Sequence, residues 1–589
     1  MSISQNFPIV SPSLNLDFAN TKALDSRITF SRPTSAVYYD GQTVTKAEEN
    51  LLSYSQEFEN AYWGKNSTTV VANSIDAPDG TTTADTLSAA GTGLNALFRS
   101  VIHPSGLNTV SIYAKKGTKS VLQFSSAALG VPAGRANFDL DTGSLGTVDV
   151  AWDASIIDAG NGWYRCVATF IGTGTTGNFL VSMQDSTTAA RDALSTAGNL
   201  YLWGLQWEVR DAVTAYQPTT TQPITNYIPT LLTAPANSAR FDHNPVTGES
   251  LGLLVEEQRT NLLTYSSDYT NVAWLKGNST ITANTIVAPD GTLTASKLIE
   301  STSAGYHYLQ ESITFDGTTK TISIYAKAAE RNWIALGTGA ECTFNLSTGT
   351  IGALGVSTTS ASITPVGNGW YRCSVTGADI SGGNYVFLQP NSTAISYTGD
   401  GVSGVYLWGA QLEAGSFPTS YIKTEASQVT RSADSASMTG ANFSDWYRPD
   451  EGSLFVDFKF ELSGYAGDTA MFVGGGNVIA YRSANETTGT NVVIYNKGVF
   501  EVDVADTQPT VAGNTKTAFC YATNDFALTV NGGAIIADSS VIVPTTMTTL
   551  NIGAGAVGGA GYRECNTTIK KLAYYPQRLS NENLQALTS

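Results

Sequence analysis

Short runs of alternating apolar and polar residues recur along the chain, and glycine-rich turns separate them. Residues 109–114 and 164–170 have this period of two, which is typical of a strand with one buried face. Sequences that favour tight turns, such as residues 78–80 and 160–162, lie between such runs. No long segment of residues 50–220 has the period of an amphipathic helix. The pattern predicts an all-β chain of short strands.

Part of this pattern occurs twice. The sequence GNGWYRC stands at residues 160–166 and again at residues 367–373, inside two long blocks that match from beginning to end. The blocks begin at Asn50 and Asn261, and the offset between them stays almost constant. The repeat is far longer than the unit of a solenoid, so each copy is expected to be a whole domain.

The repeats divide the chain into six parts. Each repeat is expected to be a β-sandwich of the jelly-roll kind, because its short strands alternate with turns every eight to twelve residues. The last part begins with a strictly alternating strand at residues 452–460 and ends in a short helix that Ser580 caps. The expected parts are an N-terminal attachment segment (1–49), the first repeat (50–220), a linker with a β-hairpin (221–260), the second repeat (261–423), a second linker (424–450) and a C-terminal sandwich (451–589).

Composition and charge exclude several classes of partner. The net charge is −17, and nucleic acids or anionic membranes require clustered Lys and Arg instead. No run of about 18 apolar residues predicts a membrane span. The first residues lack the features of a signal peptide, so synthesis in a cytoplasm is expected.

The five cysteines have no metal-binding spacing. Cys166 and Cys373 end the two copies of GNGWYRC and are expected to be buried thiols. Cys520 and Cys565 could pair, but cytoplasmic synthesis favours the reduced form.

Several stretches resemble parts of bacteriophage tail and tail-fibre proteins. They are residues 241–257 followed by 260–266, and residues 406–415 followed by 418–422. The repeats resemble carbohydrate-binding-module-like jelly rolls. Residues 451–589, especially 569–576, resemble a concanavalin A-like, laminin-G-like sandwich. The resemblance implies a virion structural protein, made in the host cytoplasm, that contacts the host surface. It transfers no ligand-binding residue.

Aromatic side chains outside the repeated motif are the candidates for contact with sugar rings, whose apolar faces pack on aromatic rings. Trp152, Tyr306 and Trp333 are the glycan-binding candidates. The repeated tryptophans are instead interpreted as packing in the core or at its edge, because a motif shared by both repeats reports the fold; they are Trp163, Trp203, Trp370 and Trp408.

Metal and catalytic sites are not indicated. Asp79, Asp139 and Asp141 could supply oxygen ligands to Ca²⁺. However, the second repeat has Asn345 and Ser347 in place of the last two aspartates, which favours hairpin turns and no cofactor. The GxGxxG sequence at residues 553–558 is followed by no helix, so it is interpreted as a loop. The three histidines stand near no nucleophile elbow, and no pair of carboxylates is singled out for glycoside cleavage.

The sequence therefore predicts a non-enzymatic virion protein. The expected function is that of a tail fibre or tail-associated adhesin that binds host surface polysaccharide. It is expected to attach to other virion proteins through its N-terminal segment and to form a homo-oligomer, with a trimer expected from the family. The alternative is a purely structural component, such as a head decoration, head fibre or tail-junction protein. A depolymerase is a third hypothesis.

Overall fold

The computed structural model describes residues 10–126, 133–313, 316–337, 342–355, 358–377, 384–460, 467–475, 477–483, 491–496, 499–505, 513–553 and 566–589. Strands dominate these residues, and the helices among them are α1 (Phe18–Thr21), α2 (Ala441–Ser444) and α3 (Asn581–Thr588). The predicted all-β fold is confirmed. No helix in the described segments has the length and apolar character that a membrane span requires.

The first repeat is a sandwich of two six-stranded antiparallel sheets around one apolar core. We call the sheet that contains the GNGWYRC strand the Trp sheet, and its partner the opposite sheet. The strands of its Trp sheet are, in spatial order, β12 (Trp152–Gly160), β13 (Trp163–Gly172), β8 (Gly106–Lys116), β15 (Gly198–Glu208), β6 (Ala84–Ala89) and β5 (Thr69–Ile75). Those of its opposite sheet are β11 (Ser144–Val148), β10 (Gly134–Asp139), β9 (Val121–Ser126), β14 (Thr175–Gln184), β7 (Ala96–His103) and β4 (Gly64–Asn66).

The second repeat has the same strand order, strand for strand, around its own core. Its Trp sheet comprises β29 (Thr358–Gly367), β30 (Trp370–Gly377), β25 (Lys320–Ala328), β33 (Gly404–Ala414), β22 (Ala295–Glu300) and β21 (Ser279–Ile286). Its opposite sheet comprises β28 (Thr350–Ile351), β27 (Cys342–Asn345), β26 (Trp333–Gly337), β31 (Asn384–Gln389), β24 (Tyr308–Glu311) and β20 (Leu275–Gly277). A small pair, β23 (Ala304–Gly305) and β32 (Tyr397–Thr398), lies beside it. The duplication in sequence is thus a duplication of the fold.

The GNG sequence has a local structural reason in both copies. It forms the tight turn from β12 to β13 and from β29 to β30, and Asn161 and Asn368 adopt φ angles of 54° and 47° at its centre. Asn and Gly tolerate this left-handed conformation, which other side chains resist. The turn sets the register that places the following tryptophan on the outer face of the sheet.

A two-stranded ribbon leads into and out of each repeat. The first is long and joins β3 (Ala36–Asn50) to β16 (Ile224–Ala234), whereas the second is short and joins β19 (Arg259–Asn261) to β34 (Val429–Arg431). A buried asparagine ends the incoming strand in both cases. Asn50 Nδ2 donates to the carbonyls of Leu205 and Gln217, and its Oδ1 accepts from the backbone N–H groups of Leu52 and Trp207. Asn261 makes the equivalent four hydrogen bonds in the second repeat. The repeated asparagine therefore closes each sandwich.

The C-terminal sandwich collects strands from three distant parts of the chain around one core. One sheet comprises β17 (Arg240–His243), β18 (Ser250–Val255), β45 (Thr567–Tyr575), β36 (Glu451–Phe460), β41 (Gly513–Ala522), β42 (Asp525–Val530) and β43 (Ile536–Asp538), with β1 (Leu14–Asp17) also on β45. The other comprises β2 (Thr29–Ser31), β35 (Ser435–Thr439), β44 (Thr549–Ile552), β37 (Gly467–Gly474), β38 (Asn477–Ser483), β39 (Asn491–Asn496) and β40 (Val499–Ala505).

This assembly differs from the domain division expected from the sequence. Residues 14–31, expected to attach to another protein, bury Leu14, Leu16 and Phe18 in the core of the C-terminal sandwich. The hairpin of the first linker adds two strands to the same sandwich. The N-terminal segment is too small to form a core of its own, and its apolar side chains are buried in the core of the C-terminal sandwich.

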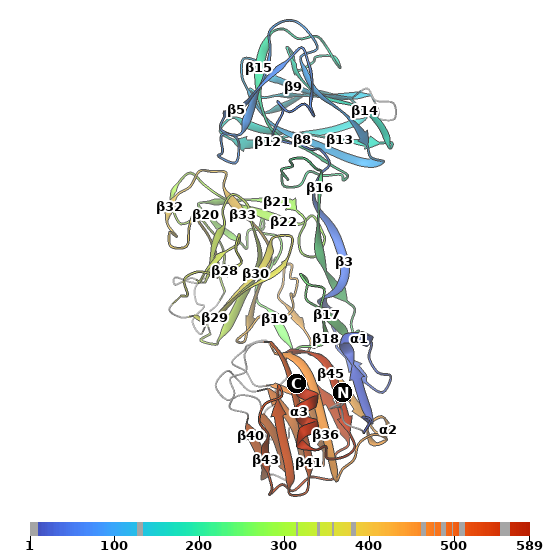
Figure 1. Ribbon diagram of the computed structural model, residues 1–589. Helices are drawn as coiled ribbons and strands as arrows, with labels where there is room; N and C mark the ends of the chain where they lie inside the picture. Colours follow the sequence, from blue (N-terminus) through green and yellow to red (C-terminus); the bar gives the residue numbers. More distant parts are fainter. Residues whose placement is uncertain are drawn as a thin grey trace.

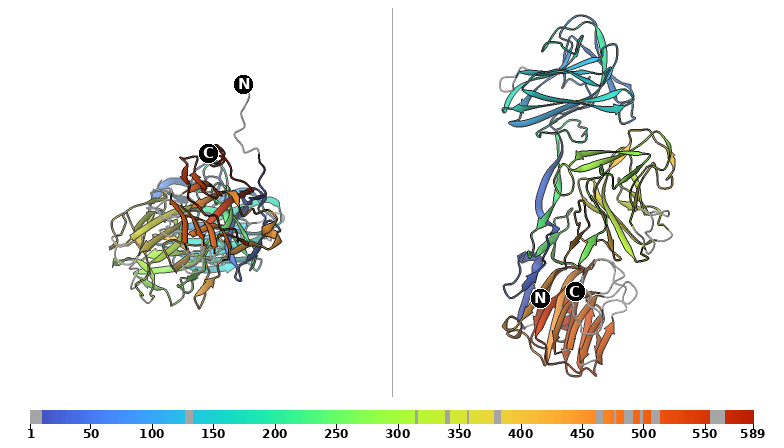
Figure 2. Two further views of the ribbon diagram at one scale, coloured as in Figure 1. Left: turned by 90° about the horizontal axis from the view of Figure 1, so that it is seen from below. Right: turned by 180° about the vertical axis from the view of Figure 1, so that it is seen from behind.

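The three sandwiches lie one after another (Figure 1). The first repeat occupies one end, the C-terminal sandwich occupies the other, and the second repeat lies between them. The ribbon of β3 and β16 runs along the side of the second repeat, as the view from behind also shows (Figure 2).

Candidate binding faces of the two repeats

Trp152, one of the three glycan-binding candidates, lies in the core of the first repeat. Its side chain is 5% exposed, and its indole stacks on Phe170 with ring centroids 4.7 Å apart. Phe179 lies parallel to it at 6.4 Å. In this arrangement both neighbours are core residues, so no face of Trp152 is open to a sugar.

Tyr306 and Trp333 lie on the outer side of the opposite sheet of the second repeat. Tyr306 precedes β24 and is 48% exposed, whereas Trp333 begins β26 and is half-buried. The ring of Tyr306 lies 6.1 Å from that of Phe387, and the ring of Tyr308 lies 5.7 Å from Phe387. With exposed Leu275 on the edge strand, these three rings form an aromatic cluster that sequence reasoning found only in part.

The repeated tryptophans are buried, as predicted: Trp163, Trp203, Trp370 and Trp408 are each at most 5% exposed. They lie on the outer face of the Trp sheets, in small clusters separate from the main cores. What covers them differs between the repeats.

In the second repeat the ribbon covers the outer face of the Trp sheet. Tyr39, Ala47, Ile228 and Leu231 of the ribbon belong to one apolar cluster with that face, which contributes Tyr325, Trp370, Trp408 and Tyr421. Tyr325 and Tyr421 are only 2% and 3% exposed as a result.

A polar contact fixes the ribbon at the edge of this face. Lys327 Nζ lies 2.8 Å from Glu48 Oε1, and Asn368 Nδ2 donates to Glu48 Oε2 at 2.7 Å. The side chain of Glu48 is 3% exposed. Burial disfavours its charged form, but Lys327 and Asn368 outweigh that effect, and the pKa of Glu48 lies below its ordinary value. The GNGWYRC turn of the second repeat is therefore also a docking element.

The same face of the first repeat has no ribbon over it. Tyr113, Tyr201 and Tyr216 take the places of Tyr325, Tyr406 and Tyr421 and are half-buried. Tyr113, Trp203 and Tyr216 still contact one another, with ring centroids 4.7 to 6.2 Å apart. Sequence reasoning missed these tyrosines because it set aside every aromatic residue near the repeated motif.

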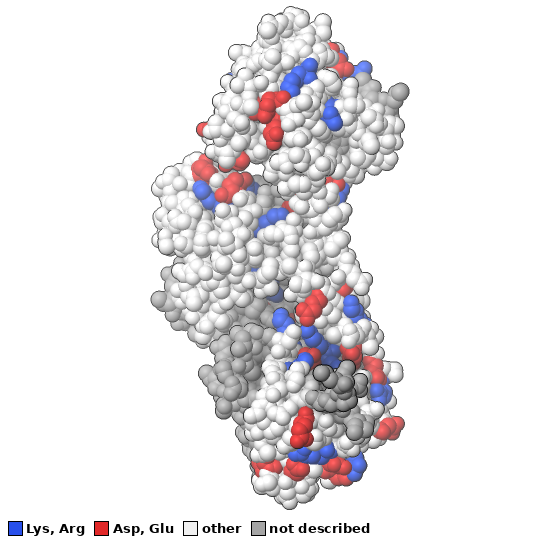
Figure 3. Space-filling model, in the orientation of Figure 1, with Lys and Arg blue, Asp and Glu red and all other residues white. Residues whose placement is uncertain are grey.

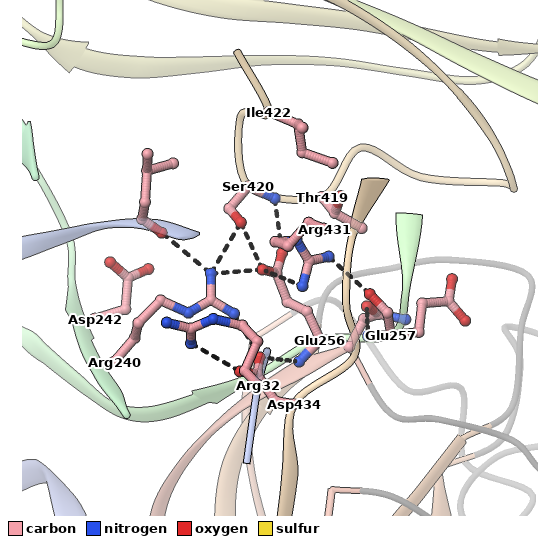
Figure 4. Close-up of polar contacts among 12 residues, drawn as sticks. Arg32, Arg240, Asp242, Glu256, Glu257, Thr419, Ser420, Ile422, Arg431 and Asp434 are labelled. Carbon is pink, nitrogen blue, oxygen red and sulfur yellow. Dashed lines mark hydrogen bonds and ion pairs between the residues drawn. The ribbon is translucent and has the colours of Figure 1, made fainter. Parts of the chain in front are cut away.

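A buried charge cluster joins the second repeat to the C-terminal sandwich (Figure 4). Asp434 accepts from Arg32 Nη1 at 2.9 Å and also from Arg240, and none of these three side chains is exposed. Arg240 Nη1 lies 2.7 Å from Glu256, which also accepts from the backbone N–H and the hydroxyl of Ser420. Burial opposes the charge of Glu256, yet Arg431 and Arg240 hold its pKa far below the ordinary value. The cluster ties together four segments of chain and is structural.

The aspartates considered for Ca²⁺ accept turn hydrogen bonds or pair with a lysine. Asp79 accepts from Thr81, Asp139 accepts from the N–H of Asp141, and Asp141 pairs with Lys116. Within the described residues no group of three or more metal-binding side chains occurs.

Cys166 and Cys373 are buried free thiols, as predicted, and Cys520 is also free and buried. Cys565 lies outside the described residues, and so do residues 554–558 of the GxGxxG sequence. Charged side chains gather in a few groups on the face shown in Figure 3, and most of the second repeat there carries none.

No family model and no curated protein matches this chain. Its fold is similar to parts of solved structures. The CBM40 of a Ruminococcus gnavus IT-sialidase, bound to α2,6-sialyllactose, is 15% identical with a TM-score of 0.21, and the match covers 24% of this chain and 85% of that one. The NanB sialidase of Streptococcus pneumoniae is 12% identical with a TM-score of 0.22, and the match covers 25% of this chain and 26% of that one. The LG1–3 region of the laminin α2 chain is 9% identical with a TM-score of 0.18, and the match covers 84% of this chain and 97% of that one. Likeness at this level identifies neither a family nor a ligand.

Proposed function

We propose that this protein is a bacteriophage virion structural protein, a tail fibre or tail-associated adhesin, that binds host surface glycans without cleaving them. The observation that carries the glycan-binding part is the exposed ring of Tyr306 beside Tyr308 and Phe387. The virion assignment is supported by the resemblance of residues 241–266 and 406–422 to tail proteins.

The aromatic cluster has the chemistry that a sugar needs. Pyranose rings pack their C–H faces on aromatic rings, and nearby amides or carboxylates hydrogen-bond to their hydroxyls. Asn278 is exposed and donates to the carbonyl of Tyr306, so its amide lies at the backbone of the same residue. The exposed part of the site is small, which fits weak binding by one domain.

Weak sites become effective through copy number. A homo-oligomer, for which a trimer is the expected state, raises the avidity by about 10² to 10⁴ when its sites bind together. The arrangement of the three sandwiches supports the role of an adhesin. The ribbon and the buried charges hold the domains in fixed relative positions.

Binding of the intact protein to host cells, to unrelated cells and to extracted host polysaccharide tests the proposal. Tyr306→Ala is expected to lower binding to host cells at least tenfold, whereas Tyr227→Ala, which removes a tyrosine of similar exposure (56%) from the ribbon, leaves it unchanged. Removing the residues after about 450 is not a suitable way to locate the site. It would leave strands of the N-terminal part, which pair with the C-terminal sandwich, without their partners.

Two results would overturn the proposal. Failure of the intact protein to bind any cell or polysaccharide would favour the purely structural alternative, a head decoration, head fibre or tail-junction protein. Release of reducing ends from the polysaccharide would favour a depolymerase.

A further inference from the structure

The two repeats present the same pair of polar side chains at the edge of the Trp sheet. In the second repeat, Lys327 and Asn368 bind the carboxylate of Glu48. In the first repeat, Lys115 and Asn161 occupy the equivalent positions, since each lysine stands opposite the tryptophan that follows its GNG turn. The fold therefore builds this carboxylate-binding pair twice.

The pair in the first repeat has no carboxylate bound to it. Lys115 Nζ donates to the main-chain oxygen of Asn161 at 2.7 Å, and it forms no ion pair with an acidic residue in the part of the chain that the structure describes. Asn161 is exposed, whereas Asn368 is half-buried beneath the ribbon. The donors that hold Glu48 in one repeat face solvent in the other.

An aromatic surface adjoins this pair. Tyr201 lies directly opposite Lys115 on the neighbouring strand, and Tyr113 lies opposite Trp203. Both tyrosines are half-buried, so part of each side chain is accessible to solvent. The guanidinium of Arg165 lies 5.1 Å from the centre of the Tyr113 ring, and Trp203 and Tyr216 contact the same ring. A ligand with one carboxylate and an apolar ring face would find both of its partners here.

The first repeat also differs from the second in how this face is filled. Asp76 and Ala159 stand where the second repeat has Val287 and Val366, both of which are buried against the ribbon. The replacements make the face of the first repeat more polar and less completely filled. This favours a hydroxyl-rich ligand over a second apolar protein surface.

A protein ribbon could not follow the same path over the first repeat. In the second repeat a Cβ atom placed on Gly367 would lie 2.5 Å from Pro229 of the ribbon, which shows how closely the ribbon approaches the turn. At the equivalent Gly160 the nearest atoms belong to Val402 of the second repeat, at 3.2 Å. A side chain of the second repeat, Val402, thus lies at this turn, where the ribbon lies at the equivalent turn of the second repeat.

We propose that Lys115 and Asn161, with the accessible parts of Tyr201 and Tyr113, bind a carboxylate-bearing sugar of an acidic glycan. The sugar carboxylate takes the place that Glu48 takes in the second repeat, and its ring packs on the tyrosines. The inference rests on the proposed function, which it deepens by naming a second site and the class of glycan.

The charge of the protein sets the conditions for binding. The net charge of −17 repels an acidic glycan at long range, but at physiological ionic strength such repulsion is screened beyond about 8 Å. A contact between Lys115 and a carboxylate acts at hydrogen-bond distance and is much less affected by screening. Affinity for the acidic sugar is therefore expected to rise as salt is added and then to level off.

The test measures binding of the intact protein to oligomers of galacturonic acid, glucuronic acid and sialic acid by calorimetry, with carboxyl-reduced forms as controls. Binding of at least one acidic oligomer is expected, with at least tenfold loss after carboxyl reduction. Lys115→Met keeps the aliphatic stem and Asn161→Gly keeps the left-handed turn, and each should weaken binding at least tenfold. Lys115→Arg should retain binding within a few fold. Lys116→Met, which removes the adjacent exposed lysine, is the matched control and should have no effect.

The outcomes separate this inference from the proposed function. If the protein binds host glycan through Tyr306 but no acidic oligomer binds, or if Lys115→Met leaves acidic binding unchanged, the second site is wrong and the adhesin stands. If an acidic oligomer binds and Lys115→Met abolishes it, the site is established even where Tyr306→Ala has no effect. If the intact protein binds no glycan of any kind, both proposals fail together.

Discussion

Glu48 and Lys327 form an ion pair of 2.8 Å across 279 residues of sequence. Glu48 belongs to the strand that leads into the first repeat, whereas Lys327 belongs to the Trp sheet of the second. Because the Glu48 side chain is 3% exposed, the pair is little screened by solvent. It fixes the ribbon, and with it the first repeat, relative to the second.

Replacing Glu48 by Gln should destabilise this docking. Breaking a buried ion pair leaves an uncompensated charge and costs about 3–5 kcal/mol. We expect scanning calorimetry to show a lower melting temperature for the second repeat. We also expect limited proteolysis to cut within the ribbon strands β3 and β16. Glu425→Gln, at a side chain that is 82% exposed, should change neither measurement.

Asp434→Asn should weaken the junction with the C-terminal sandwich by a similar amount. An amide has one acceptor oxygen and cannot satisfy both Arg32 and Arg240, so the loss is about 3–5 kcal/mol. Chemical unfolding followed by amide hydrogen exchange in the strands of that sandwich measures the effect. Asp450→Asn disrupts an exposed pair with Arg448 and should leave the free energy of unfolding unchanged. An equal loss in both variants would contradict the structural role of the cluster.

Deleting residues 1–31 should unfold the C-terminal sandwich although the deletion lies at the opposite end of the sequence. It removes β1 and β2, one strand from each sheet, together with three buried apolar side chains of α1 and β1. Rapid proteolysis of the C-terminal sandwich, with both repeats resistant, is the expected pattern. Deleting residues 1–9 alone should leave the sandwich resistant.

The first repeat should lose stability as the pH rises from about 4 to about 6. Asp85 is 1% exposed, and burial raises its pKa to about 6 even though it accepts hydrogen bonds from Phe58 and Asn73. An acid with a raised pKa in the folded state binds its proton more tightly when folded, so the stability it adds is present at low pH and is lost as the pH rises. A shift of this size corresponds to about 3 kcal/mol. In Asp85→Ser, which copies Ser296 of the second repeat, this slope in the melting temperature should become clearly shallower. Part of it should remain, because burial also raises the pKa of Glu208 in the same repeat.

Much of the fold could be predicted because it depends on local sequence. Alternation and turn residues define strands, and a repeated motif such as GNGWYRC reports a repeated fold. The two repeats share one strand order, and Trp163 and Trp370 are buried at the same position in it. The partners of residues 14–31 could not be predicted. The strand β1 pairs with β45 more than 550 residues away, and short strands carry no signal that names a distant partner.

The candidate site was harder to predict because a binding face is defined by exposure. Trp152 and Tyr306 are both aromatic residues outside the motif, yet one lies in a core and the other is 48% exposed. The equivalent residues Tyr113 and Tyr325 have the same local sequence but different environments, since only the second lies under the ribbon. The sequence of a repeat does not show whether another segment of the chain covers its outer face.

The ribbon also determines how this molecule would carry mechanical load. Its strands β3 and β16 run antiparallel, and both connect the first repeat to the C-terminal sandwich. A force that pulls these two ends apart is therefore shared by two covalent backbones in parallel, and it does not unzip the hydrogen bonds between them. A chain that crossed this distance once would have only one backbone to resist the same tension.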